Sequence, residues 1–207
     1  MNNVDDVTAF VLAGGKSTRM GKDKAFLEFK GRILLARALE LAAAVAKDVR
    51  IVGDRSKFAA FGRVIEDIYR ERGPLGGIHA ALKSSPTELN LMLAVDLPFV
   101  ERSFLKYLVS VARDAKVVVT VPRANDGLQP LCAVYRREFA QAAEQSLAQG
   151  KNKIDALFAE VDTKILGPQE LSEAGFSAEM FRNLNTPEEF EKAAHIANRE
   201  RKLETKS

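Results

Sequence analysis

Short apolar runs alternate along this chain with longer stretches of helical periodicity. The short runs suit strands, and several of them are apolar at consecutive positions rather than at every second position. Consecutive apolar positions are typical of strands that helices cover on both faces. The expected strands are residues 8–13, 49–52, 63–65, 91–95, 117–121 and 131–135.

The longer stretches between these runs place apolar residues at the spacing of amphipathic helices. Ser103 has the side chain of a helix N-cap, and Gly150 stands where a glycine commonly ends a helix. A last helix is expected to begin at Pro187 and to end in a charged tail at about residues 195–207. The other expected helices are residues 33–46, 75–85, 103–115 and 137–150.

This alternation predicts a three-layer α/β/α Rossmann-like sandwich with a mostly parallel sheet. The 207 residues suit a single domain over 1–207, and no repeat or linker divides them. In such folds ligands bind beyond the carboxyl ends of the strands. The residues that follow each strand are therefore the candidate site residues.

A glycine pair and a cationic loop follow the first expected strand, in "VLAGGKSTRMGKDK". Gly14 and Gly15 allow the backbone to approach a ligand closely, and Arg19 and Lys24 are among the cations that can bind phosphate oxygens. The spacing matches neither a Walker loop nor G-x-G-x-x-G. The pattern predicts a polyphosphate-binding loop, with a flexible solvated turn as the alternative.

Two carboxylates and a second glycine-rich segment also follow strands. Asp96, before Pro98 in "VDLPF", suits a divalent ion that bridges phosphates, or else the cap of the next helix. Asp67 is either a ligand contact or a turn residue. Between them, "GPLGGI" opens a helix with small residues, which would admit a base or ribose to the backbone, or would simply form a tight turn.

The composition argues against a nucleic-acid-binding protein and against a membrane protein. With 31 basic and 28 acidic residues the net charge is +3, too balanced for a nucleic-acid-binding protein. No signal peptide or membrane span is evident, so we expect no membrane association and a cytoplasmic location.

The residues that most often carry covalent or metal chemistry are scarce. The lone Cys132 lies in an apolar run and is interpreted as a core residue. His79 and His195 have no acidic or cysteine neighbour at ligand spacing, which argues against a histidine metal site or triad. No G-x-S-x-G motif is present, so we expect chemistry without a covalent intermediate.

Taken together, the motifs resemble those of the molybdenum cofactor guanylyltransferases, a branch of the nucleotidyltransferases with a glycosyltransferase A-type, nucleotide-diphospho-sugar transferase fold. The resemblance runs in order from near the start to about Ala193 and rests on "LAGGKSTRMGKDKAFLEFKG", "GPLGGI", "DLPF", "LQPLCAVY" and "NLNTPEEFEKA".

The resemblance implies a reaction and its participants. Such enzymes transfer GMP from GTP, with Mg²⁺, to the phosphate of molybdenum-molybdopterin, releasing pyrophosphate and forming the molybdopterin guanine dinucleotide cofactor. It implies molybdenum-insertion proteins and apo-molybdoenzymes or their chaperones as protein partners.

The resemblance also assigns roles to residues of this chain. The catalytic set is Arg19, Lys24 and Asp96, with Asp96 as the metal ligand. The expected second-substrate residues are Gln129, Pro130, Asn183 and Asn185. The expected nucleotide-binding residues are Leu12, Ala13, Gly14, Gly15, Lys24, Asp67, Gly77 and Asp96.

One position bears on the choice of nucleotide, and another departs from the family pattern. Related cytidylyl and uridylyl transferases tend to have alanine where Gly14 stands, so the missing methyl group makes room for a purine and favours GTP. Asp54 stands where some members have asparagine, and is either a nucleotide contact or an exposed turn acid.

Three alternatives to guanylyl transfer stay open. They are a CTP-dependent molybdopterin cytidylyltransferase, a sugar-phosphate nucleotidyltransferase, and a non-catalytic GTP-binding module that hands the cofactor on. The joint presence of Arg19, Lys24 and Asp96 argues against the last.

Overall fold

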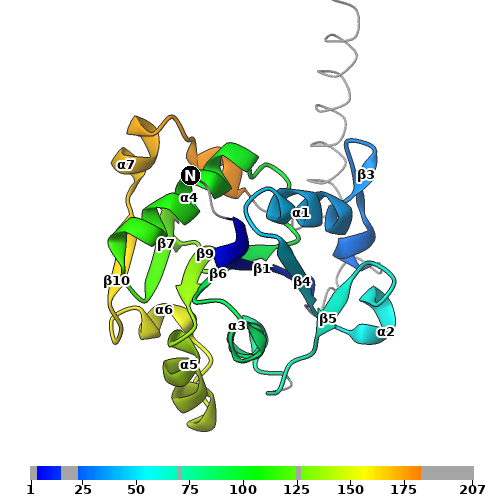
Figure 1. Ribbon diagram of the computed structural model, residues 1–207, viewed down its shortest axis with the longest axis horizontal. Coiled ribbons are helices and arrows are strands. Elements are labelled where there is room, and N and C mark those ends of the chain that lie inside the picture. The colour runs from blue at the N-terminus through cyan, green and yellow to red at the C-terminus, as the bar shows by residue number, and fades with distance from the viewer. Residues whose placement is uncertain (1–3, 15–22, 70, 125–126, 183–207) are drawn as a thin grey trace, which may run out of the picture.

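A computed structural model describes residues 4–14, 23–69, 71–124 and 127–182 (Figure 1). One sheet dominates the structure, and a two-stranded hairpin lies beside it. The hairpin is β2 (Glu28–Phe29) and β3 (Arg32–Ile33). The sheet contains β1 (Val7–Leu12), β4 (Asp48–Val52), β5 (Arg63–Ile65), β6 (Leu89–Ala94), β7 (Val119–Ala124), β8 (Gly127–Leu128), β9 (Cys132–Arg136) and β10 (Thr163–Leu166).

The strand order is β10-β7-β9-β6-β1-β4-β5, with β8 paired to β7 alone. Neighbours pair in parallel from β6 through β1 and β4 to β5, and β10 is parallel to β7. Strand β9 runs antiparallel to both β6 and β7. The mostly parallel sheet predicted from the sequence is confirmed.

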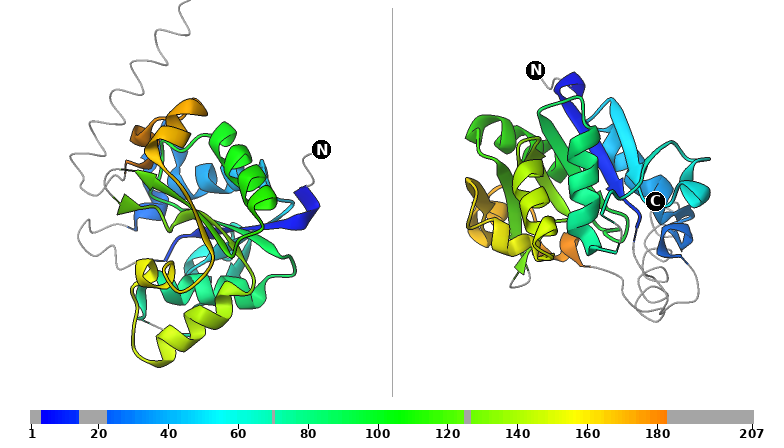
Figure 2. Two further views of the ribbon diagram at one scale, coloured as in Figure 1. Left: turned by 90° about the vertical axis from the view of Figure 1, so that its left-hand side faces the viewer. Right: turned by 90° about the horizontal axis from the view of Figure 1, so that it is seen from below.

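Helices cover both faces of the sheet, as the two turned views show (Figure 2). One layer contains α1 (Leu34–Ala43), α4 (Arg102–Ala115) and α7 (Pro168–Glu173). The other contains α3 (Gly73–Ser84), α5 (Phe139–Ala148) and α6 (Ile154–Leu157). The three-layer prediction is therefore confirmed. The short elements are η1 (Val4–Asp6), η3 (Lys24–Phe26), α2 (Arg55–Phe58) and η4 (Ala178–Phe181).

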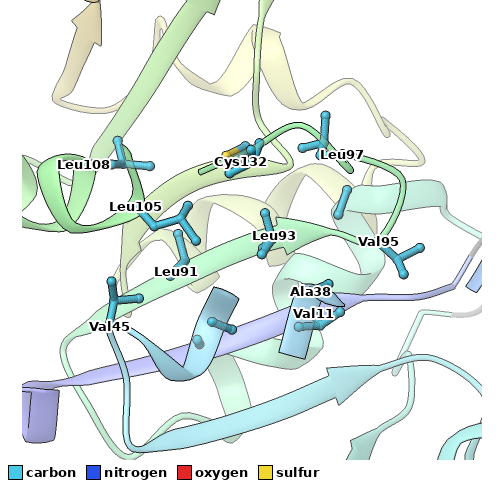
Figure 3. Packing of buried hydrophobic residues seen from close by; sticks show 14 of the residues in the cluster. Val11, Ala38, Val45, Leu91, Leu93, Val95, Leu97, Leu105, Leu108 and Cys132 are labelled. Atoms are coloured by element: carbon cyan, nitrogen blue, oxygen red, sulfur yellow. The ribbon is translucent and has the colours of Figure 1, made fainter. Parts of the chain in front are cut away.

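The core on the α1 and α4 side is built from strand and helix side chains (Figure 3). Val11 of β1 and Leu93 of β6 pack with Ala38 of α1 and Leu105 of α4. Cys132 lies in the same cluster with 1% of its surface exposed, and burial raises the pKa of its thiol to about 12. The burial confirms its interpretation as a core residue. The raised pKa disfavours the reactive thiolate form.

The two helix-end predictions have opposite outcomes. Gly150 has a φ of 75° and its N–H donates to Leu147 O, while Lys151 N–H donates to Ser146 O, which is a glycine-terminated helix end as predicted. The expectation that Ser103 caps α4 is wrong, because Glu101 occupies the N-cap position and Ser103 lies inside the first turn.

Two further observations bear on the sequence-based expectations. The helix expected from Pro187 and the tail at 195–207 lie outside the described residues. Among the described residues, no helix combines the length and apolar character needed to cross a bilayer.

Candidate active site

The carboxyl ends of β1, β4, β5 and β6 meet at one edge of the sheet because these strands are parallel. Leu12 is in register with Val52 on one side and with Ala94 on the other. The antiparallel β9 begins at this edge, since Cys132 pairs with Leu93. The turn that contains Gln129 therefore reaches the same edge from the other direction.

The end of β1 is held by hydrogen bonds from both neighbouring strands. Val52 O accepts from Ala13 N at 3.0 Å and from Gly14 N at 3.2 Å, and Leu12 O accepts from Val95 N at 3.1 Å. The N–H groups of Ala13 and Gly14 are therefore used within the fold. Gly15 and Arg19 lie outside the described residues.

The surroundings of Gly14 leave space for a side chain. A Cβ atom there would lie 3.7 Å from Gly53 Cα and 3.8 Å from Val52 O, both ordinary contact distances. Gly14 does not have a left-handed backbone, and it is exposed. The fold itself does not require glycine at this position.

Lys24 and Asp96 form an ion pair although 72 positions separate them in the sequence. Lys24 Nζ lies 3.5 Å from Asp96 Oδ2, with side-chain exposures of 18% and 26%. Asp23 starts the η3 turn by accepting from Ala25 N, and it also pairs with Lys57 Nζ at 3.0 Å. Asp96 is not a helix cap, because α4 begins at Arg102 with Glu101 at its N-cap.

Asp67 lies between the end of β5 and the first turns of α3. Its Oδ1 is 3.4 Å from the position that a Cβ would take on Gly77, and its Oδ2 is 3.6 Å from that on Gly76. Burial raises the pKa of this carboxyl. In the part of the chain that the structure describes, the Asp67 carboxylate has no hydrogen-bond or ion-pair partner.

The glycines that open α3 are required by packing. A Cβ on Gly76 would lie 2.8 Å from Tyr69 O, and one on Gly77 would lie 3.2 Å from Val52 Cγ1 and 3.6 Å from Leu12 Cδ2. Gly73 has a φ of 63°, in the left-handed region. The segment thus makes a tight turn and also brings Gly77 and Asp67 beside Leu12 at the strand ends.

The carboxylates at this edge suit a metal that also binds phosphates. The described residues contain no group of three or more His, Cys, Asp or Glu side chains arranged around a common point. Mg²⁺ commonly takes only one or two protein carboxylates and completes its shell with phosphates and water. The partly exposed Asp96 fits that mode of binding.

Three predicted positions have their polar groups engaged in local structure. The Gln129 amide donates to Ala124 O at 3.1 Å, and Pro130 O accepts from the Tyr135 hydroxyl at 2.8 Å, so both stabilise the turn before β9. Asp54 caps α2, accepting from Ser56 N at 2.8 Å and from Ser56 Oγ at 2.6 Å. Those bonds lower the pKa of Asp54, and of its two interpretations the geometry supports the exposed turn acid.

The expected second-substrate residues Asn183 and Asn185 lie outside the described part of the chain. A cavity of about 460 Å³ beside the Asp96 loop was not predicted from the sequence. Phe29, Lys30 and Phe99 line it, and all three belong to segments quoted above for their similarity to known motifs. The aromatic and cationic residues inside those motifs were therefore the sequence signal that could have indicated this cavity.

Comparisons with known proteins agree with this geometry. A family model of the MobA-like NTP transferase domain matches residues 9–164. The molybdenum cofactor guanylyltransferase of Desulfosudis oleivorans is 34% identical over 193 residues, which make up 92% of this chain and 95% of that protein.

Solved structures extend the similarity to three dimensions. Molybdopterin-guanine dinucleotide biosynthesis protein A from Archaeoglobus fulgidus matches with a TM-score of 0.80 and 25% identity, covering 93% of this chain and 99% of that one. 4-Diphosphocytidyl-2C-methyl-D-erythritol synthase from Anaerococcus prevotii has a TM-score of 0.70 at 15% identity, covering 94% of this chain and 96% of its own. At that identity the likeness concerns the fold alone.

Proposed function

This chain belongs to the molybdenum cofactor guanylyltransferase family, and we propose that it transfers GMP from GTP to the terminal phosphate of molybdenum-molybdopterin. The products are pyrophosphate and the guanine dinucleotide form of the cofactor. The observation that carries the proposal is the Lys24–Asp96 pair at the carboxyl edge of the sheet. A nucleoside triphosphate bound beyond the strand ends, as is usual in such folds, would meet this cation and this carboxylate.

The proposed reaction is a direct displacement. A terminal phosphate oxygen of the pterin attacks the α-phosphorus of GTP, and a new P–O bond forms there. The bond from the α-phosphorus to the oxygen that bridges to the β-phosphorus breaks, and its electron pair leaves with pyrophosphate. Such chemistry requires alignment of the reactants and stabilisation of charge rather than a protein nucleophile.

Lys24 and Asp96 have separate roles in this proposal. The Lys24 ammonium binds phosphate oxygens and stabilises the negative charge that develops on them. The Asp96 carboxylate is the proposed ligand for Mg²⁺, which when bound neutralises part of the triphosphate charge. In the absence of substrates, the 3.5 Å pair holds the two side chains in place by mutual attraction.

Asp67 is proposed to recognise the base. A carboxylate only accepts hydrogen bonds, and the N1–H and N2–H₂ groups of guanine offer two donors on one edge. Asp67 has no partner among the residues that the structure describes, which leaves its oxygens available there, and its position beside Gly77 puts it next to the proposed base pocket. Cytosine and uracil do not present that pair of donors, so Asp67 favours GTP.

The proposed setting follows from the substrates. GTP is a cytoplasmic metabolite, so we place the reaction in the cytoplasm. Molybdenum-insertion proteins are the proposed source of the pterin substrate, and apo-molybdoenzymes or their chaperones are the proposed recipients of the product.

A comparison of two aspartate variants tests the proposal. Asp96→Ala is expected to lower GTP- and molybdopterin-dependent release of pyrophosphate by at least about 100-fold, since it removes the proposed metal ligand. Asp114→Ala, at an exposed position on α4, serves as the matched control and is expected to keep full activity. Circular dichroism checks that both variants fold. Activity in folded Asp96→Ala equal to that of the control contradicts the assignment.

A further inference from the structure

A cavity of about 460 Å³ lies beside the loop that carries Asp96. Phe29 and Lys30 of the β2–β3 hairpin, Arg37 of α1, Phe99 of the loop and Arg182 after η4 are among its lining residues. Phe99 follows Asp96 by three positions, so their Cα atoms are at most about 11 Å apart. The cavity is therefore close enough to the proposed phosphate site for one ligand to span both.

Phe99 and Arg182 form a flat cationic platform at this cavity. The Arg182 guanidinium carbon lies 4.7 Å from the centroid of the Phe99 ring. Phe29 contacts Phe99 edge to face, with centroids 5.5 Å apart and ring planes at 82°, and so supports it from within the core. Arg182 keeps 53% of its side chain exposed, and its Nη1 lies 3.8 Å from Glu179 Oε2. A planar heteroaromatic ring can stack on such a surface.

Arg37 adds unused hydrogen-bond donors to the same cavity. Its Nε donates to Pro98 O at 2.8 Å, which ties α1 to the Asp96 loop. Burial lowers the pKa of Arg37, but a guanidinium stays charged in proteins. Among the described residues its terminal nitrogens have no hydrogen-bond or ion-pair partner. A half-buried cation with free donors favours an oxygen-bearing ligand.

We propose that this cavity binds the ring system of the second substrate, with the ring stacked on the Phe99–Arg182 platform and Arg37 donating to oxygen atoms at its edge. The inference rests on the proposed function, because a pterin that carries a phosphate is the substrate whose chemistry matches. In this arrangement the phosphate extends toward Asp96 and the α-phosphorus of GTP.

Kinetics of two variants test the proposal under anaerobic conditions. Phe99→Leu and Arg182→Gln are each expected to raise the KM for molybdopterin about tenfold, as the loss of one stacking contact predicts. The Kd for GTP with Mg²⁺, measured by calorimetry, is expected to change less than twofold. The matched controls are Phe61→Leu, at an exposed phenylalanine beside α2, and Arg63→Gln, at the start of β5 and so at the end of that strand that points away from the site. Both variants are expected to keep the wild-type KM for molybdopterin.

A direct binding measurement separates the proposed catalytic function from the proposed binding of the ring in this cavity. Equilibrium dialysis of molybdopterin, quantified by its pterin fluorescence, is expected to show the same tenfold loss in Phe99→Leu and Arg182→Gln without any turnover. Wild-type protein that binds molybdopterin but forms no dinucleotide contradicts the proposed function and not this inference. Variants that bind molybdopterin as the wild type does, or that only lose thermal stability, overturn this inference and assign the side chains to packing.

Discussion

Replacing Gly14 with alanine separates what the fold requires from what a base-binding site requires. A Cβ at Gly14 would lie 3.7 Å from Gly53 Cα and 3.8 Å from Val52 O, so the protein can accept a methyl group without moving. The backbone of Gly14 is not left-handed. A glycine-to-alanine change at such a site stabilises a protein by about 0.4–1 kcal/mol, because it restricts the unfolded chain.

The same methyl group is expected to reduce the use of GTP. If the purine lies against Gly14, the extra carbon overpacks the interface by about 1–3 kcal/mol, which corresponds to roughly 5- to 150-fold in kcat/KM for GTP. The smaller CTP should lose much less, so the ratio of the two kcat/KM values should fall by about that factor. Steady-state rates with each nucleotide and a urea titration measure both effects.

The matched comparison is Gly76→Ala, where the new Cβ would lie 2.8 Å from Tyr69 O. This variant is expected to lose at least about 1 kcal/mol of stability, because a backbone carbonyl cannot easily move aside. An unchanged GTP to CTP ratio in Gly14→Ala would refute the placement of the base. A loss of more than about 1 kcal/mol in that variant would show that the fold needs Gly14 after all.

Three further substitutions have expected outcomes. Arg50→Met removes the hydrogen bonds that a buried guanidinium donates to Asp48 and to Ser84 O at the end of α3, and should lower the free energy of unfolding in urea by about 2 kcal/mol. A loss smaller than the error of the titration would contradict a stabilising role for these hydrogen bonds. Asp67→Asn should weaken GTP binding in calorimetry yet raise the melting temperature at neutral pH, because burial raises the pKa of Asp67 and disfavours its charged form in the folded protein. The gain should vanish below about pH 4, where the carboxyl is protonated in the folded and unfolded states alike, and a lower melting temperature of the variant at pH 7 would contradict this effect of burial. His79 is buried, its ring nitrogens have no hydrogen-bond partner among the described residues, and Glu144 Oε2 lies 3.9 Å from its Nε2. Burial outweighs the attraction of that carboxylate and lowers the pKa of His79, so stability should fall as the pH drops below about 6.5 and the unfolded chain takes up the proton. His79→Leu should lose this part of the pH dependence, and the same pH dependence of the melting temperature in both proteins would contradict it.

Much of the fold could be predicted from apolar periodicity alone. The six expected strands and the four expected helices between them all occur, with ends shifted by a few residues. Strand β10 was missed because it lies at the sheet edge, where only Leu166 is buried, and so lacks a continuous apolar run. Ser103 was mistaken for a cap because the helix starts at Arg102, two residues before its apolar pattern begins at Phe104.

The candidate site was predictable in part, since the segments that follow the strands and contain Lys24, Asp67 and Asp96 could be located from the sequence. Their geometry could not, because the Lys24–Asp96 contact depends on the three-dimensional pairing of β1 with β6. The cavity beside Phe99 was harder still, because its walls come from segments distant in the sequence and no single one of them has a distinctive pattern.

Guanylyl transfer can be tested by offering the purified protein equal amounts of GTP, CTP, ATP and UTP with Mg²⁺ and molybdenum-molybdopterin. The mass of the dinucleotide product then identifies the transferred nucleotide, and pyrophosphate release measures turnover. We expect the guanine dinucleotide as the main product, with one pyrophosphate released for each molecule formed. A cytosine dinucleotide as the main product, or no dinucleotide from folded protein, would contradict it.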